Sequence, residues 1–99
     1  MEEQSIELAR ESGVESRSVL IEFPGEALRV SAQDFGPATR MMGSDDGELE
    51  FWVDVPKDAL RRLAAMLIKD RFMGHSQAVS EFRKFCEENN IPHEFMIWS

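Results

Sequence analysis

A strand that passes directly into a helix, between Gly47 and Phe72, constrains the fold of this chain most strongly. Apolar side chains occupy every second position of the strand: Leu49, Phe51, Val53 and Val55. Pro56 follows at once, and proline suits the first turn of a helix because its missing N–H would be unpaired there anyway. After it, apolar residues recur at spacings of three and four: Leu60, Leu63, Ala64, Leu67, Ile68 and Phe72. These two periodicities predict a strand with one buried face and then a helix with one buried stripe.

Two further alternating runs precede this stretch and are separated by a turn signal. Residues 17–23 and 28–33 both alternate between apolar and polar side chains, and the first run is rich in β-branched residues. Pro24 and Gly25 lie between them, a pair that is typical of tight turns. We therefore expect an antiparallel hairpin, followed by a long loop that leads into the strand after Gly47.

A second helix is predicted between Gly74 and Asn89. Gly74 is suited to end the first helix, and the second can begin at His75 or Ser76. Its apolar residues lie on one face: Ala78, Val79, Phe82, Phe85 and Cys86. Asn89-Asn90 then fits a left-handed end, with Pro92 preventing continuation. In residues 93–98 Phe95 and Ile97 alternate with Met96 and Trp98, which predicts a closing strand that is paired and covered on both faces.

The order of these elements predicts one α+β domain. We expect a mostly antiparallel sheet of four to five strands, in the order β-β-β-α-α-β, with two consecutive helices packed on one face. Residues 17–99 would form this single domain. Residues 1–16 are predicted to be a weakly ordered arm or a short extra strand, because Ile6 and Leu8 alternate with polar neighbours.

Charge is distributed unevenly along the chain. The net charge is -8, and residues 1–50 hold twelve of the nineteen acidic side chains but only four of the eleven Lys and Arg. Such a field repels nucleic acid and anionic membranes and favours association with basic proteins. Solubility alone is an equally simple explanation for the acidity, so both interpretations stay open.

Residues with catalytic or metal-binding chemistry are few and poorly spaced for it. His75, Cys86 and His93 match no zinc pattern, and Cys86 falls on the apolar helix face, where a thiol is inert. The acidic turn at residues 45–48 lacks the alternating oxygen ligands of a calcium loop. We expect no catalytic, cofactor or metal site, and no enzyme. The lone cysteine and the acidic N-terminus favour a cytoplasmic protein.

Trp52 is the anomaly of the central strand. It alternates with the apolar positions and so falls on the polar face with three carboxylates: Glu48, Glu50 and Asp54. Either a neighbouring segment or an arginine side chain covers the indole, or Trp52 is an exposed anchor of the kind found at the centre of binding surfaces. Met41 and Met42, in the loop before the strand, either cover the end of the core or add adaptable apolar contacts to that surface.

These observations lead to two functional hypotheses. The first is a small cytoplasmic binding or inhibitor module, resembling an immunity protein in its role, that shields a basic protein partner through Trp52, Glu48, Glu50, Asp54, Met41 and Met42. The alternative is an accessory or housekeeping domain that forms a homodimer through the same strand face, without catalytic activity. Neither hypothesis involves a membrane, a cofactor or direct contact with nucleic acid.

Overall fold

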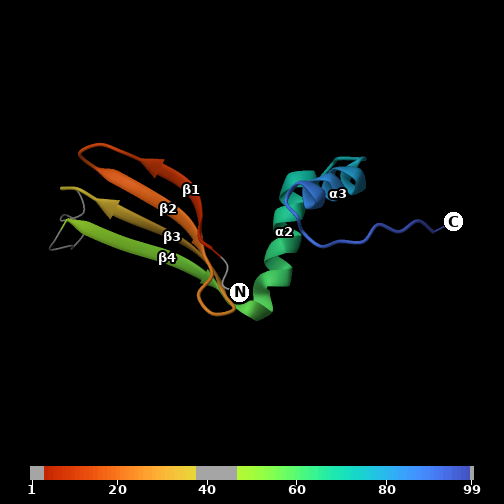
Figure 1. The fold of residues 1–99 in the computed structure, drawn as a ribbon, viewed down its shortest axis with the longest axis horizontal. Coiled ribbons are helices and arrows are strands. Elements are labelled where there is room, and N and C mark those ends of the chain that lie inside the picture. The colour runs from red at the N-terminus through yellow and green to blue at the C-terminus, as the bar shows by residue number, and fades with distance from the viewer. Residues whose placement is uncertain (1–3, 38–46, 99) are drawn as a thin grey trace. The chain divides into compact units, whose positions relative to one another are not determined.

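The structure is a computed structural model that describes residues 4–37 and 47–98. Four strands are followed by two α-helices (Figure 1), which confirms the α+β class. The elements are β1 (Ile6–Glu11), β2 (Ser16–Glu22), β3 (Leu28–Phe35), β4 (Glu48–Val55), the 3-10 helix η1 (Lys57–Ala59), α2 (Leu60–Phe72) and α3 (Ala78–Glu88). The chain divides into two compact units, Met1–Arg62 and Leu63–Ser99, which are described in turn. That residues 17–99 form one domain stays a prediction.

The first unit is an antiparallel sheet in which each strand pairs with its neighbours in sequence. Its order is β1-β2-β3-β4. The predicted hairpin is confirmed as β2 and β3, with Val19 opposite Ala32. Its turn closes where the Ala27 N–H donates to the Pro24 carbonyl over 3.0 Å. Gly25 supplies the positive φ of 61° that this turn needs, a conformation which glycine adopts without steric cost.

β1 is the extra N-terminal strand. It pairs with β2, with Ile6 opposite Ile21, and its register shifts between Glu7 and Ala9. Every residue of β1 is exposed. A bulge on an edge strand is a common way of discouraging further pairing, and β1 forms one edge of this sheet.

The two faces of the sheet differ sharply in chemistry. Directly opposite residues share a face, so the pairing places one set of apolar side chains together. We call this the apolar face: Val19, Ile21, Val30, Ala32, Phe51 and Val53. Ala32 is buried, whereas Phe51 and Val53 are 45% and 68% exposed. The alternation in β4 is thus confirmed, but the burial predicted for its apolar side is not. The packing of two helices on this face stays a prediction.

An ion pair spans one end of the apolar face. Arg17 on β2 lies directly opposite Asp34 on β3, and its Nε and Nη2 donate to the two carboxylate oxygens over 2.6 and 2.7 Å. The same guanidinium lies 5.4 Å from the centroid of the Phe51 ring. A bidentate arginine therefore connects β2, β3 and β4 across the sheet.

The second unit is a pair of helices joined by a short turn. Phe72 at the end of α2 meets Phe82 of α3 edge to face, with ring centroids 6.2 Å apart. Arg71 lies over the Phe85 ring at 4.8 Å. The stripe predicted for α2 is only partly buried: Leu67 and Ile68, expected inside, are 59% and 38% exposed. Two helices alone cannot enclose a stripe this wide.

The predicted end of α3 is confirmed in detail. Asn90 has a left-handed φ of 55°. The Ile91 N–H donates to the Cys86 carbonyl over 2.9 Å, and the Asn90 N–H donates to the Glu87 carbonyl over 3.3 Å. These are the two hydrogen bonds of a Schellman motif, which satisfies the last carbonyls of a helix.

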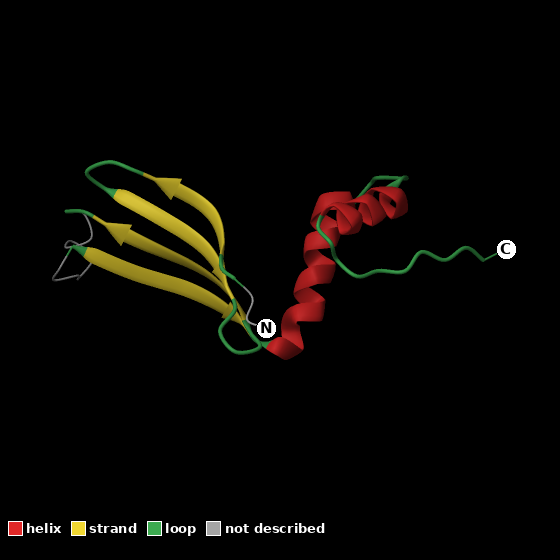
Figure 2. Cartoon of the chain, in the orientation of Figure 1, coloured by secondary structure: helices red, strands yellow, loops and turns green. Residues whose placement is uncertain are grey.

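The closing strand predicted for residues 93–98 is wrong. Residues 91–98 form neither strand nor helix in the structure, and Figure 2 shows them as an extended loop. A strand needs a neighbouring backbone with free hydrogen-bonding groups. The described residues of the helical unit contain no strand that could supply one. Apolar alternation therefore predicted the extended conformation of this segment and not its pairing.

Candidate functional site

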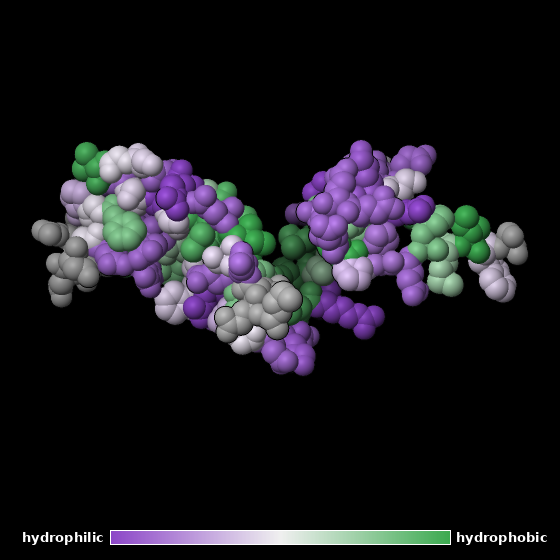
Figure 3. All heavy atoms as spheres, in the orientation of Figure 1, coloured by the Kyte–Doolittle hydropathy of each residue, from purple (hydrophilic) through white to green (hydrophobic). Residues whose placement is uncertain are grey.

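The candidate site is the polar face of the sheet around Trp52. Trp52 on β4 lies opposite Ser31 on β3, and Ser31 lies opposite Leu20 on β2. A small side chain on the middle strand thus separates two large ones on the same face. The result is a hollow of about 240 Å³ between Leu20 and Trp52. Figure 3 shows hydrophilic and hydrophobic residues mixed on the visible side of the sheet.

Carboxylates border the hollow, and neutral groups orient them. Leu20, Ser31 and Trp52 form one row of facing residues across the three strands, and the next row on the same face contains Glu22. The Glu22 carboxylate accepts a hydrogen bond from the Ser31 hydroxyl. On the opposite side of the Ser31 row, Gln33 lies opposite Glu50. The Gln33 amide donates a hydrogen bond to Glu50 over 2.9 Å and another to Glu48. Because a hydroxyl and an amide carry no charge, these hydrogen bonds fix the carboxylates without cancelling their negative charge.

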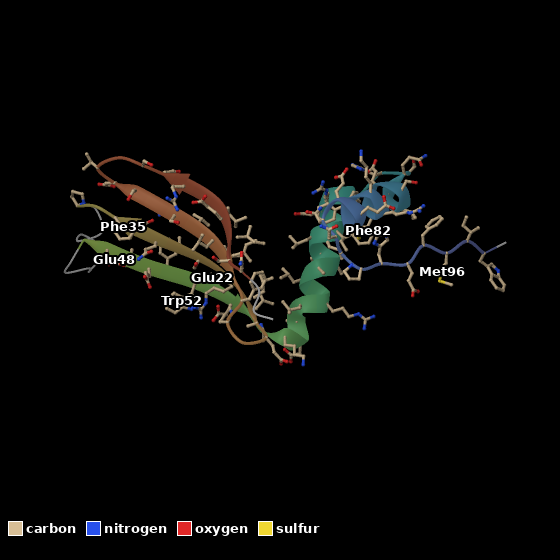
Figure 4. All side chains as sticks on the ribbon, in the orientation of Figure 1. Glu22, Phe35, Glu48, Trp52, Phe82 and Met96 are labelled. Carbon is tan, nitrogen blue, oxygen red and sulfur yellow. The ribbon has the colours of Figure 1, made fainter. Side chains whose placement is uncertain are left out.

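Trp52 is stacked on one side and open on the other. The Arg29 guanidinium lies 4.7 Å from the centroid of the indole, an arrangement in which the cation is attracted to the electron-rich ring face. Nevertheless 51% of Trp52 is exposed. An arginine therefore covers part of the ring, as one alternative drawn from the sequence expected, while half of the residue stays exposed. That Trp52 anchors a partner stays a prediction. Figure 4 shows Trp52 with Glu22 and Glu48 on the sheet.

Arg29 is held in turn by Asp54. The two residues are directly opposite, and Arg29 Nε and Nη2 donate to Asp54 Oδ1 and Oδ2 over 2.6 and 3.0 Å. This hydrogen bonding lowers the pKa of Asp54 and raises the pKa of Arg29. Asp54 therefore differs from the other predicted site residues. Its charge is offset by Arg29, and its role is to position the cation that stacks on Trp52.

Acid should weaken the sheet through its two arginine–aspartate pairs. Hydrogen bonds from arginine lower the folded-state pKa of Asp34 and Asp54 below the ordinary value of 3.8. The pairs therefore stabilise fully above that value and progressively less as the pH falls through the lower, folded-state pKa. The Asp34→Asn/Asp54→Asn variant should be less stable than the wild type near pH 6. Its free energy of unfolding should then fall less than that of the wild type as the pH is lowered to about pH 2.

Urea unfolding followed by Trp52 fluorescence, in a Trp98→Phe background, measures this acid dependence. Glu88→Gln on α3 serves as the control and should keep the wild-type profile. A double variant that lost as much stability as the wild type between about pH 4 and pH 2 would show that the two ion pairs do not cause the loss of stability in acid.

The structure brings together four of the six predicted site residues. Glu48, Glu50, Trp52 and Asp54 share the polar face of β4. Met41 and Met42 lie outside the described residues. The residues that sequence reasoning missed come from the hairpin: Leu20, Glu22, Arg29, Ser31 and Gln33. Their alternation already placed them on the polar sides of β2 and β3, but only the strand register sets them beside Trp52.

The other chemically reactive residues noted in the sequence, Cys86, His75 and His93, belong to the helical unit. Cys86 is 3% exposed on α3. His75 Nδ1 lies 2.8 Å from a Glu81 oxygen, and His93 Nδ1 lies 2.7 Å from the Ile91 carbonyl oxygen. Within residues 4–37 and 47–98, no three acidic, histidine or cysteine side chains gather in a way that could hold a metal ion.

Comparison of the chain with known protein families, curated proteins and solved structures finds no match. In the described part of the chain, neither α2 nor α3 has the length and apolar character needed to cross a lipid bilayer. Function must therefore be argued from the geometry around Trp52.

Proposed function

We propose that this chain is a small acidic binding or inhibitor module that shields a basic protein partner, and that the hollow beside Trp52 receives a lysine or arginine side chain of that partner. The observation that carries the proposal is a half-exposed indole beside a hollow bordered by Glu22 and Glu50. Aromatic anchors within a polar rim are typical of the energetic centre of protein interfaces.

The chemistry of the hollow suits a long cationic side chain. Leu20 and Trp52 offer apolar walls for the methylene groups of lysine or arginine. Glu22 and Glu50 lie on either side of the row formed by Leu20, Ser31 and Trp52, and their carboxylates are placed to pair with the cationic head. A volume of about 240 Å³ is smaller than the roughly 300–1,000 Å³ of drug-sized ligand sites, which favours a single side chain over a free ligand.

The charge balance of the site also favours a cation. Arg29 is the cation among the residues that line the hollow, and Asp54 offsets its charge. The carboxylates of Glu22 and Glu50 accept from neutral donors and so keep the site negative. The excess of acidic residues in the first half of the chain would steer a basic partner toward this face, more strongly at low salt.

Self-association through the same face is the second candidate function. It is favoured by one observation: β4, which carries Trp52, is an edge strand of the sheet. An edge strand has unpaired backbone groups that can join a second copy. Light scattering at several protein and salt concentrations distinguishes the two. A salt-insensitive dimer that Trp52→Ala abolishes would favour self-association through this face. A chain that retains a basic protein at low salt, and whose association state Trp52→Ala leaves unchanged, favours the binding module.

Affinity capture from the source cell tests the proposed function. The immobilised chain should retain a basic protein at low salt and release it as salt rises, because Debye screening weakens charge pairing. Glu22→Gln/Glu50→Gln should bind this protein about 10-fold more weakly or worse, since paired charges at an interface each contribute on the order of 1 kcal/mol.

Glu87→Gln/Glu88→Gln provides a control with the same change in net charge, placed on α3. It should retain the basic protein as the wild type does. Equal losses in the two double variants would mean that only overall charge matters. Capture of an acidic protein instead, or of none, would contradict the proposal.

A further inference from the structure

The helical unit contains an open apolar groove between α2 and α3. Its volume is about 720 Å³, and the side chains that form most of it are Leu67, Ile68, Phe82, Phe85, Cys86 and Ile91. Leu67 is 59% exposed there, and Ile68 and Phe82 are each more than one-third exposed. Exposed apolar grooves of this kind are typical of sites that bind an apolar segment.

The same unit carries an exposed apolar segment of matching character. Residues 95–98 are Phe-Met-Ile-Trp, without helix or strand structure. Met96, Ile97 and Trp98 are 82%, 81% and 97% exposed. Ile91, four residues before the segment, lines the groove. Phe95 packs on α3, where the Arg83 guanidinium lies 4.2 Å from its ring centroid, and the chain continues beyond it as an extended loop (Figure 1). Groove and segment are thus two uncovered apolar surfaces on one unit.

Charges at the two surfaces are complementary. Arg71 lines the groove, and its guanidinium stacks on Phe72 and Phe85 at 5.5 and 4.8 Å. Glu94 directly precedes the apolar segment. Among the ion pairs of the described residues, neither Arg71 nor Glu94 takes part in one. A carboxylate entering with the segment would therefore meet an arginine that is available at the groove.

We propose that the groove receives residues 95–98 of a second copy of this chain, with Glu94 of the second copy beside Arg71, and that the exchange is reciprocal. Closed two-fold pairing follows naturally because each copy supplies one groove and one segment. Residues 95–98 of the same copy do not line this groove, and Phe95 instead stacks on Arg83 of α3. This surface lies in the helical unit and is separate from the Trp52 site.

Sedimentation equilibrium of the full chain over a range of concentrations tests the pairing. The wild type should form a dimer. Met96→Ser/Trp98→Ser, which changes two exposed side chains, should raise the dimer dissociation constant about 100-fold or more because both lose their apolar burial. Leu67→Asp in the groove should have a similar effect. Val79→Asp is the control, since Val79 is a 71% exposed residue of α3 that does not line the groove, and it should dimerise as the wild type does.

Charge reversal in trans then separates exchange between copies from any return of the segment to its own groove. Arg71→Glu and Glu94→Arg should each weaken the dimer a few-fold, because like charges then meet at both grooves. An equimolar mixture of the two variants restores opposite charges at both grooves of a mixed dimer and should recover the wild-type dissociation constant. A monomer at all concentrations, a dimer that ignores the segment and groove variants, or a mixture without recovery would each overturn the proposal.

Discussion

Replacing Trp52 with alanine is expected to abolish capture of the basic partner while leaving the sheet folded. Half of the indole is exposed, so it can enter an interface, and truncation of such anchors weakens binding by about 2 kcal/mol or more, which is roughly 30-fold. The expected loss of folding stability is smaller, because Trp52 contributes mainly its stacking with Arg29, and a cation–ring contact at an exposed site is worth about 0.5–1 kcal/mol.

Capture of the partner and urea unfolding of the same variant separate these two effects. Trp98→Ala is the matched control: it removes a second exposed indole, in the helical unit, and should leave capture unchanged. A Trp52→Ala chain that unfolds as readily as a core variant would identify Trp52 as a structural residue. Trp98→Ala and Trp52→Ala should also differ in self-association, since residues 95–98 are proposed to serve the dimer and Trp52 to serve the partner.

Gly36→Ala should destabilise the sheet by about 2–3 kcal/mol, a large part of the roughly 5–15 kcal/mol that stabilises a domain. Gly36 directly follows β3, and its N–H donates to the Gly47 carbonyl over 2.9 Å at the entrance to β4. Its φ is +129°, a value that side chains rarely tolerate. A Cβ would lie only 2.8 Å from the Val14 carbonyl oxygen and 2.9 Å from the Glu15 Cα, both backbone atoms of the β1–β2 turn.

Gly25→Ala is the comparison that isolates this close approach. Gly25 also has a positive φ, of 61°, but nothing lies within 4 Å of the position of its Cβ. It should cost only the left-handed strain, about 1–2 kcal/mol. Urea unfolding of both variants by circular dichroism measures the difference. Equal urea midpoints for the two variants would show that the β1–β2 turn shifts to accommodate the new Cβ, and that the close contact at Gly36 does not itself lower the free energy of unfolding.

Local periodicity was sufficient to predict most elements of this fold. The alternation in β2, β3 and β4 and the wider spacing in α2 and α3 predicted the type of each element, because a residue's face within one element depends only on its own backbone geometry. The burial expected on the helices was not found: Leu67 and Ile68 of α2 and Val79 of α3 are 59%, 38% and 71% exposed. The end of α3 was also predictable, since Asn90 tolerates a left-handed φ and Pro92 cannot continue a helix. The closing strand was predicted wrongly, because alternation in residues 95–98 carries no information about a neighbouring backbone.

The candidate site was predicted from only one of its three strands. Trp52 stood out because a large aromatic side chain occupied a polar position of β4. A stacked arginine was one alternative drawn from the sequence, but the sequence could not identify Arg29 as that residue. Nor could it show that Asp54 would pair with Arg29 while the uncharged Gln33 amide donates to Glu50. Those distinctions depend on which residues lie opposite each other, and the connection between β3 and β4 leaves the register open.

The amino-acid sequence by itself determined the elements of this protein, its acidic first half and the face on which Trp52 lies, because these follow from local backbone geometry and formal charge. The tertiary structure alone decided that Ser31 separates Leu20 from Trp52, that Arg29 is shared between Trp52 and Asp54, and that residues 95–98 join no strand. The physical reason is that register and packing join residues distant in the chain, and local patterns do not encode those contacts.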